Sequence, residues 1–350
     1  MDACGMIGTL ARIARQLVAD GKGLLAIDES NPTCNRRFAA LGIAQTEDAR
    51  RAWRELIITA PGLGDAIGGV ILYDETIRQS DRNRVGFLDL LAKAGIVAGI
   101  KVDAGTTDLP RCPGEKVTEG LDRLRQRLAT YAAMGARFAK WRAVFTISAQ
   151  GPSEGCIMAN AHTLARYAAL AQEAGLVPVI EPEVLMAGPH TIGRCAAVTQ
   201  TVLRAVFAQA CEQGVILEGM VLKTAMILPG TDCPVQDGLE EVTTATLTTL
   251  RRAVPAAVPA VVFLSGGQGA TLASARLNDI SRRALDARAE HALPWPLSFS
   301  FARAIQQPAL EIWRGRDDHA AAAQAMLVHR ARCNRAARQG QYRPDMELAP

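Results

Sequence analysis

The sequence predicts an α/β fold, namely a (β/α)8 TIM barrel with an extra N-terminal helix and C-terminal helices. The first observation is a repeated arrangement, in which a short apolar run rich in β-branched residues precedes a longer segment with helical periodicity. The second is that the run occurs eight times, because eight parallel strands close such a barrel. The third is the even spacing of the run ends, 28 to 47 residues apart, which disfavours a doubly wound open sheet.

Each element of this barrel has its own signal in the chain. The eight expected strands are 23–28, 69–75, 97–103, 137–142, 176–183, 216–223, 260–265 and 297–303. Helices are expected over 46–60, 118–134, 155–175 and 190–213, and Ser, Thr or Asp near several of their starts fits N-capping. An amphipathic helix precedes the first strand, and 303–338 supplies one or two helices after the last. We therefore expect a single domain over 1–350, with 339–350 as a mobile tail.

Composition excludes several classes of protein. With 49% hydrophobic and 21% charged residues, the chain is not disordered as a whole. A net charge of +4 without long runs of like charge argues against nucleic-acid or membrane partners. No apolar stretch reaches about 18 residues, and the N-terminus lacks the apolar core of a signal peptide, so we expect a cytoplasmic protein. The eight cysteines and five histidines form no metal-binding spacing, which predicts reduced thiols and no metal.

Lysine is scarce in this chain. It has 33 arginines and only six lysines, at positions 22, 93, 101, 116, 140 and 223. An arginine cannot lose its proton at neutral pH, whereas a lysine can, so a lysine kept against this bias indicates amine chemistry. Three of the six, Lys101, Lys140 and Lys223, stand at the ends of expected strands.

Charged residues end most of the strands, and the active site of such a barrel lies at those carboxyl ends. Three pairs are spaced i, i+2 and so share one face of a strand: Lys101 with Asp103, Lys140 with Arg142, and Glu181 with Glu183. Any single pair could instead be part of a ring of interior salt bridges that has no catalytic role. Charges at so many strand ends favour a polar catalytic mouth instead.

The residue types in this ring indicate Schiff-base chemistry. Clustered cations and partial burial are expected to lower the pKa of a lysine, and the free amine can then attack a carbonyl. Lys223 is the best candidate, because it follows the apolar run MVL. Glu181 or Glu183 could shuttle the proton that expels water from the carbinolamine, and Asp28 could exchange a proton at the substrate carbons.

Two groups of residues could bind phosphates. The turn Ser265-Gly266-Gly267-Gln268-Gly269 offers backbone N–H groups at the usual phosphate site of this fold, with Arg303 after the last strand. A second cationic patch across the mouth is expected from Ser30, Arg37, Lys101 and Arg142. Two anion sites that flank an amine suggest a bisphosphorylated carbonyl substrate.

These residues occur in motifs that resemble class I fructose-1,6-bisphosphate aldolases over about residues 10 to 342. The motifs, in order, are GKGLLAIDESNPTCNRRFAALGI, GIKVD, FAKWR, EPEVL, LEGMVLK, FLSGGQ and FSFARA. The resemblance implies reversible cleavage of fructose 1,6-bisphosphate to glycerone phosphate and glyceraldehyde 3-phosphate, in glycolysis and gluconeogenesis. It implies that neither a metal nor a cofactor takes part in the reaction. It also implies a homo-oligomer, often a tetramer.

Carried over by position, the resemblance assigns roles to individual residues. Lys223 resembles the Schiff-base lysine, Glu181 the general acid and base, and Glu183 its electrostatic neighbour. Asp28 resembles the aspartate that handles the proton of carbon–carbon cleavage, and Lys140 the lysine that holds the charge of the intermediates. The phosphate-1 residues would be Ser265, Gly266, Ser300 and Arg303, with Gly267 beside them, and Ser30, Arg37, Lys101 and Arg142 would bind the other end.

Two alternatives remain open at this point. The chain could be a Schiff-base aldolase for another sugar phosphate, such as a monophosphate. It could also be a binder without catalysis, because Thr224-Ala225 follows Lys223 where the family usually has Pro-Asn.

Overall fold

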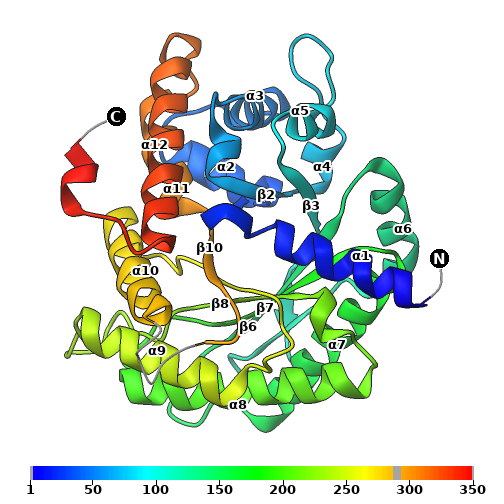
Figure 1. Ribbon diagram of the computed structural model, residues 1–350, viewed down its shortest axis with the longest axis vertical. Coiled ribbons are helices and arrows are strands. Elements are labelled where there is room, and N and C mark those ends of the chain that lie inside the picture. Colours follow the sequence, from blue (N-terminus) through cyan, green and yellow to red (C-terminus); the bar gives the residue numbers. More distant parts are fainter. Residues whose placement is uncertain (1–2, 287–292, 349–350) are drawn as a thin grey trace.

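The computed structural model describes residues 3–286 and 293–348, and its strands close into an eight-stranded parallel barrel (Figure 1). This confirms the predicted fold. The order around the barrel is β1-β10-β9-β8-β7-β6-β3-β2. The strands are β1 (Gly23–Ala26), β2 (Ile67–Leu72), β3 (Val97–Lys101), β6 (Phe138–Phe145), β7 (Val177–Val184), β8 (Val221–Thr224), β9 (Val261–Phe263) and β10 (Leu297–Phe301).

Helices lie around this barrel (Figure 1). Three of them begin at a hydroxyl N-cap, as the sequence predicts: the side chains of Thr46, Ser153 and Thr191 each accept a hydrogen bond from the backbone three residues later. The helices are α1 (Ala3–Gln16), α2 (Asn31–Ala39), α3 (Glu47–Ile58), α4 (Asp74–Ile77), α5 (Phe87–Lys93), α6 (Leu124–Met134), α7 (Glu154–Glu173), α8 (Ile192–Glu212), α9 (Leu239–Ala253), α10 (Ala270–Leu285), α11 (Arg303–Trp313) and α12 (Ala320–Arg338).

Two expected elements begin later than the sequence predicts. The helix expected over 118–134 starts at Leu124, because Gly120 (φ 124°) and Arg123 (φ 55°) are in conformations that an α-helix does not contain. Before them lies a small antiparallel ribbon of β4 (Thr106–Asp108) and β5 (Lys116–Thr118), which the sequence did not predict. The strand expected over 216–223 begins with a single 3₁₀ turn, Leu217–Gly219, so β8 is only four residues long.

The strands separate two hydrophobic cores, because alternate residues of a strand point to opposite faces. One core fills the barrel interior near the amino ends of the strands, where side chains such as Leu24, Val179 and Val262 meet Leu17, which follows α1. The other lies between the strands and the surrounding helices, with Leu25 and Ile180 among its members. The interior positions therefore stay apolar only at one end of the barrel.

The N-terminal helix closes that end, and Figure 1 shows α1 lying across the barrel. Leu10, Ile13 and Leu17 are all buried and belong to the interior core. At the start of β2 the chain passes so close to Leu17 that a Cβ atom on Gly68 would lie 2.4 Å from the Leu17 carbonyl oxygen. A glycine is required there because any side chain would displace the backbone.

The C-terminal segment makes specific contacts. A 3₁₀ turn covers Pro344–Leu348, and the buried Tyr342 donates a hydrogen bond of 2.7 Å from its hydroxyl to Glu347. The same carboxylate forms an ion pair with Arg330 of α12. The mobility expected for 339–350 stays a prediction, and residues 349–350 lie outside the described part of the chain.

Candidate active site

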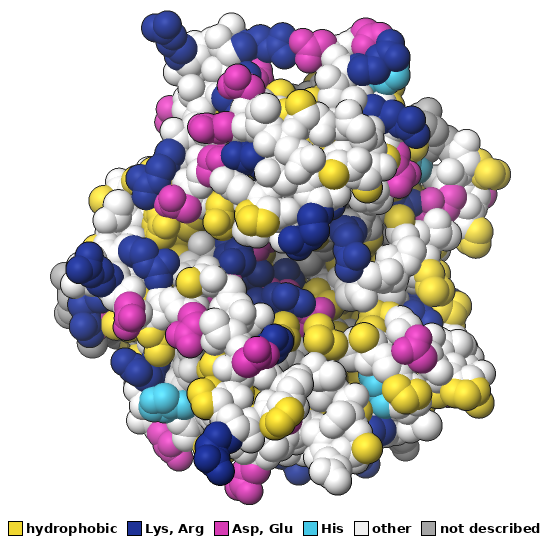
Figure 2. Space-filling view, turned by 180° about the vertical axis from the view of Figure 1, so that it is seen from behind, with side chains coloured by type: hydrophobic (Ala, Val, Ile, Leu, Met, Phe, Trp, Pro, Cys, Tyr) yellow, Lys and Arg dark blue, Asp and Glu magenta, His cyan; other side chains and the backbone are white. Residues whose placement is uncertain are grey.

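The charged strand ends meet in a hollow on the face opposite α1. Figure 2 shows this face, where Lys and Arg side chains gather with acidic ones around a central depression. On β6 and β7 the inward side chains change along the strand, from Phe138 to Lys140 and from Val179 to Glu181. The outward neighbour Trp141 stacks on Tyr167 of α7 with ring centroids 5.4 Å apart. The i, i+2 spacing therefore placed the charges correctly on the inner face.

Four of the predicted catalytic residues form one continuous chain of ion pairs. The Lys140 Nζ atom lies 2.8 Å from Asp28 Oδ2 and 2.8 Å from Glu181 Oε2. The other oxygen of Glu181 lies 3.0 Å from Lys223 Nζ. All four side chains are buried, so these charges interact in a medium much less polar than water. A proton can thus pass directly between Glu181 and Lys223.

The two carboxylates of this chain stay ionised. Burial by itself would raise the pKa of Asp28, but the positive charges of Lys140 and Lys223 outweigh it and lower that pKa to about 2. The pKa of Glu181 is also lowered, because the same two lysines outweigh the effect of its burial. Both groups are therefore proton acceptors at neutral pH.

For Lys140 the expectation of a lowered lysine pKa is wrong. Burial does favour the neutral amine, but Asp28 and Glu181 together outweigh it and raise the pKa of Lys140 above its ordinary value. The sequence shows the clustered cations, whereas the structure places the carboxylates of Asp28 and Glu181 each 2.8 Å from Lys140 Nζ. Lys140 is accordingly a permanent positive charge in the mouth.

Two further ion pairs lie nearby, one farther along β6 and β7 and one at the end of β3. Arg142 Nε contacts Glu183 Oε2 at 2.5 Å, and Lys101 Nζ contacts Asp103 Oδ1 at 2.6 Å. The Arg142 side chain remains 41% exposed, so its guanidinium can reach a ligand from the rim. The structure therefore brings both cations to the part of the mouth where the sequence placed one phosphate.

The glycine-rich turn follows β9, as expected. Gly266 (φ 58°) and Gly267 (φ 90°) both adopt left-handed conformations, which glycine allows without strain. Ser265 and Ser300 are buried, and the Ser300 hydroxyl has no hydrogen-bond partner among the described residues. Arg303 is exposed and lies beside the turn, since its Nη2 atom would be 3.3 Å from a Cβ on Gly267. These groups can bind an anion together.

The placement of Arg37 differs from the sequence expectation. A cleft of about 730 Å³ is lined by Arg37, Gly267 and Arg303, so Arg37 lies on the side of the glycine-rich turn and not with Lys101 and Arg142. The reason is its anchor: Arg37 Nη1 forms a 2.5 Å ion pair with Glu29. Lys101 and Arg142 are not among the residues that line this cleft.

Ser30 lies at the entrance to α2, next to Asp28 and Glu29 in the chain. Its hydroxyl donates a hydrogen bond of 3.2 Å to the Thr33 hydroxyl, and it is half-buried. Helix N-termini attract anions because their first N–H groups are unpaired. Ser30 is thus placed at a position where a ligand oxygen can bind.

The sequence did not predict the contacts that hold the carboxyl end of β1. Glu29 binds Arg54 of α3 at 2.9 Å and accepts a hydrogen bond of 3.0 Å from Gln306 of α11. Gln306 also donates to the carbonyl of Ala26. With the Arg37–Glu29 ion pair from α2, three helices therefore hold this strand end. Arg54 could have been noticed, because it stands between Trp53 and Ile57 on the apolar face of a predicted helix.

The residue that follows Lys223 points away from the ion-pair chain. Thr224 points to the opposite face of β8 and is buried, and its hydroxyl has no hydrogen-bond partner among the described residues. Ala225 is also buried. The Thr224-Ala225 departure therefore leaves the contacts of Lys223 with Glu181 in place.

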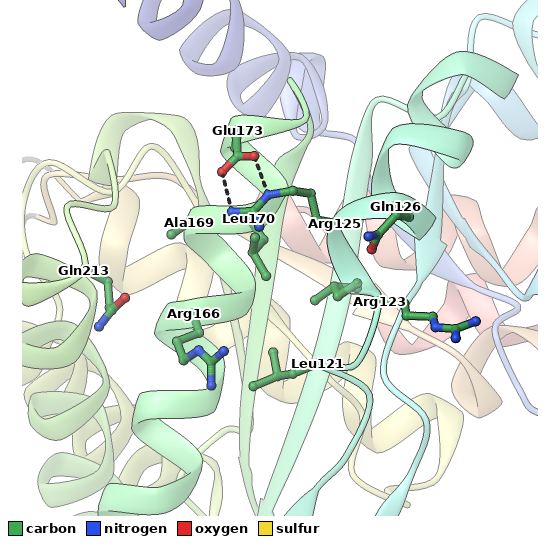
Figure 3. A pocket seen from close by; sticks show the side chains of 10 residues that line it. Leu121, Arg123, Arg125, Gln126, Arg166, Ala169, Leu170, Glu173 and Gln213 are labelled. Carbon is green, nitrogen blue, oxygen red and sulfur yellow. Dashed lines mark hydrogen bonds and ion pairs between the residues drawn. The ribbon is translucent and has the colours of Figure 1, made fainter.

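Another pocket, of about 330 Å³, lies on the outer surface between α6 and α7 (Figure 3). In it the Arg125 guanidinium donates two hydrogen bonds to the Glu173 carboxylate, 2.6 Å from Nε and 3.0 Å from Nη2. None of the residues that line it belongs to a strand end of the barrel. Its chemistry is therefore separate from that of the mouth.

The structure carries no sign of a preformed metal site or membrane span in its described parts. Within residues 3–286 and 293–348, no three His, Cys, Asp or Glu side chains are grouped to hold a metal ion. In the same ranges, no helix combines the length and apolar character needed to cross a membrane. The seven cysteines with a described side chain are free thiols.

Comparisons with known proteins agree with this geometry. The family model for class I fructose-bisphosphate aldolase matches residues 9–349. A protein of Xylella fastidiosa named "Probable fructose-bisphosphate aldolase class 1" is 50% identical over 338 residues, covering 96% of this chain and 99% of that protein. Fructose-bisphosphate aldolase C of Rattus norvegicus is 46% identical over 334 residues, covering 95% of this chain and 90% of that one.

A solved structure shares the fold as well. Fructose-bisphosphate aldolase from Plasmodium falciparum, crystallised with TRAP and a small-molecule inhibitor, superimposes with a TM-score of 0.94. It is 43% identical in sequence, and the match covers 98% of this chain and 97% of that one. The fold, the mouth and the relatives lead to one conclusion: the chain belongs to the class I fructose-bisphosphate aldolases, which are carbon–carbon lyases.

Proposed function

We propose that the mouth cleaves fructose 1,6-bisphosphate reversibly through a Schiff base on Lys223. The observation that supports this most directly is the buried chain Asp28–Lys140–Glu181–Lys223, with contacts of 2.8, 2.8 and 3.0 Å. It joins an amine, a proton carrier, a fixed cation and a second carboxylate within one small volume. Those are the groups that an aldol cleavage without metal requires.

Formation of the Schiff base uses Lys223 and Glu181. Glu181 accepts a proton from the Lys223 ammonium across 3.0 Å, which frees the nitrogen lone pair to attack the C2 carbonyl of the open-chain sugar. The resulting carbinolamine then loses its hydroxyl as water, with a proton returned by Glu181. The product is a protonated imine, whose positive charge can accept an electron pair from the neighbouring carbon.

Cleavage of the bond between C3 and C4 uses Asp28. Its carboxylate accepts the proton of the C4 hydroxyl, and the electrons of the broken bond move into the imine to form an enamine. Glyceraldehyde 3-phosphate leaves, C3 is protonated, and water releases glycerone phosphate from Lys223. Lys140 stays positively charged, because Asp28 and Glu181 raise its pKa, and it stabilises the oxygen anions that develop.

The two phosphates lie at opposite ends of the substrate. We assign the first to Ser265, Gly266, Gly267, Ser300 and Arg303, because the turn offers N–H groups and Ser300 has an unused buried hydroxyl. We assign the second to Ser30, Lys101 and Arg142. Arg37 lines the cleft beside Arg303 and would act on the side of the first phosphate.

Borohydride reduction tests this function. The enzyme is reduced in the presence of glycerone phosphate, and the peptide that contains Lys223 should gain the mass of the reduced adduct. An adduct on another lysine, or cleavage activity lost with a chelator, would contradict the proposal. Fructose 1-phosphate is compared in parallel, and faster turnover of this monophosphate would favour the alternative aldolase.

We also propose that the chain forms a homo-oligomer and works in the cytoplasm. The family resemblance supports the former, and a relative from Arabidopsis thaliana whose name describes it as cytosolic supports the latter. Sedimentation of the purified protein should give a mass that is a multiple of the monomer mass of 37.3 kDa. Fractionated cells probed with an antibody to the chain should place it in the cytoplasmic fraction.

A further inference from the structure

One buried arginine next to the mouth has no acidic partner among the described residues. Four arginines of the described chain are buried: Arg50, Arg54, Arg276 and Arg330. Three of them form ion pairs, with Glu75, Glu29 and Glu347 respectively. Arg276 is 8% exposed, and no carboxylate of the described residues forms an ion pair with it. This guanidinium is therefore unlike the other three.

The hydrogen bonds of Arg276 are also incomplete. Its Nη1 atom donates to the side-chain oxygen of Gln268 at 2.9 Å, and its Nε atom is buried with no partner among the described residues. Burial alone lowers the pKa of Arg276, and no neighbouring carboxylate offsets that effect. A buried cation is costly to the fold unless an opposite charge compensates it. The arrangement thus indicates a missing anion.

The position of Arg276 shows where this anion would act. Arg276 lies in the second turn of α10, and helical side chains lean toward the N-terminus of their helix, here toward the turn 265–269. Gln268 belongs to that turn and is itself buried. Its backbone N–H donates to the Ser265 carbonyl at 3.0 Å, and its side-chain nitrogen contacts the Met226 sulfur at 3.8 Å. Arg276 therefore lies directly behind the glycine-rich turn.

We propose that Arg276 is a positioning residue for the phosphate that binds at the turn 265–269. It fixes the Gln268 side chain and so the shape of the turn, and its uncompensated positive charge favours the bound dianion. This inference rests on the proposed binding of a substrate phosphate at that turn. Arg276 does not touch the reacting atoms, so its effect should appear in phosphate affinity and not in the chemical step.

The first experiment compares three variants of the full-length enzyme. Arg276→Gln removes the charge, Arg276→Lys keeps it, and Arg204→Gln removes an exposed arginine of α8 as a matched control. We expect Arg276→Gln to raise KM and the inhibition constant of inorganic phosphate about tenfold, with kcat changed less than about threefold. Arg276→Lys should recover most of the affinity, and Arg204→Gln should match the wild type.

A second experiment separates this inference from the proposed function. Borohydride trapping is carried out with glycerone phosphate and, separately, with dihydroxyacetone, which lacks the phosphate. In Arg276→Gln, trapping by glycerone phosphate should weaken while trapping by dihydroxyacetone stays at the wild-type level. If wild-type Lys223 forms no adduct with either compound, the proposed function fails. If the variant traps both as well as the wild type does, only the role of Arg276 fails.

A variant at a second position keeps the proposal testable if Arg276→Gln folds poorly. Gln268→Leu removes the hydrogen-bond acceptor but keeps Arg276. We expect a smaller rise in KM than in Arg276→Gln, with kcat again changed less than about threefold. Circular dichroism and thermal melting identify which variants are folded. Folded variants at both positions with KM and phosphate inhibition within twofold of the wild type would overturn the proposal.

Discussion

The two halves of the barrel interior are built by the same strands, but one half is apolar and the other is charged. On β7 the inward residue changes from Val179 to Glu181, and on β8 it changes from Val221 to Lys223. Two residues of a strand span about 6.6 Å, so the change from apolar to charged is abrupt. The apolar half is closed by α1, whereas the charged half opens to solvent.

This difference shows that one half of the barrel interior mainly stabilises the fold, whereas the other half contains the candidate active site. The apolar half is stabilised by the removal of hydrophobic side chains from water, and a cavity there lowers the free energy of unfolding. The charged half is stable only because each buried charge has an opposite neighbour, such as Lys140 between Asp28 and Glu181. Substitutions in the two halves should therefore affect different measurements.

The largest effect is expected at the reactive amine. Lys223→Arg keeps a positive charge beside Glu181 but cannot form an imine, so cleavage should fall about 10⁴-fold or more. Steady-state cleavage of fructose 1,6-bisphosphate measures this loss. Lys93→Arg is the matched control and should be close to the wild type. Near-full activity of Lys223→Arg would contradict the Schiff-base mechanism.

Removal of the central cation should affect both activity and stability. Lys140→Met leaves two buried carboxylates with only Lys223 to compensate them, which should cost about 3 kcal/mol of unfolding free energy. We also expect kcat to fall about 100-fold or more, since a fixed charge is lost. Urea unfolding and steady-state kinetics measure the two effects. A variant with unchanged kcat would mean that Lys140 only stabilises the fold.

A cavity in the apolar half should affect stability alone. Leu17→Ala removes a fully buried side chain from the interior core, and we expect the unfolding free energy to fall by about 3 kcal/mol. KM and kcat at 20 °C should stay within twofold of the wild type, on the order of assay error. Ile7→Ala, at a residue of α1 that is 37% exposed, is the control with little effect. A changed KM in Leu17→Ala would show that the halves are coupled.

The smallest effect is expected in acid. The pKa of Asp28 is lowered to about 2 from the ordinary 3.8, so its stabilising contribution is complete above pH 3.8 and is lost as the pH falls toward 2. The difference in unfolding free energy between the wild type and Asp28→Asn should therefore shrink by about 2 kcal/mol over that range. Urea titrations at several pH values measure it. A difference independent of pH would contradict the ion pair with Lys140.

Much of the mouth was predictable because strands have a simple period. The i, i+2 spacing of Lys140 with Arg142 and of Glu181 with Glu183 requires only that each strand be extended. The order of the eight apolar runs likewise required only that parallel strands alternate with helices. The elements that escaped prediction, such as the ribbon of β4 and β5, depend on short polar segments with little periodic signal.

Partners distant in sequence were not predictable. The resemblance groups Arg37 with Lys101 and Arg142, but in the structure Arg37 pairs with Glu29 and lines the same cleft as Gly267. The raised pKa of Lys140 was missed for the same reason, since the sequence shows charges but not which charge is nearest. Arg276 is the clearest case, because nothing local distinguishes it from the exposed arginines of this chain.

The sequence by itself determined the strand–helix alternation and the inward face of each charged strand end, and it predicted an amine as the nucleophile. These properties follow from local periodicity and from what an amine can do that a guanidinium cannot. Only the tertiary structure decided that Asp28 and Lys140, 112 residues apart, share one ion pair, and that α1 closes the opposite end. Barrel closure and strand register set those distances, and both arise from contacts between segments far apart in the chain.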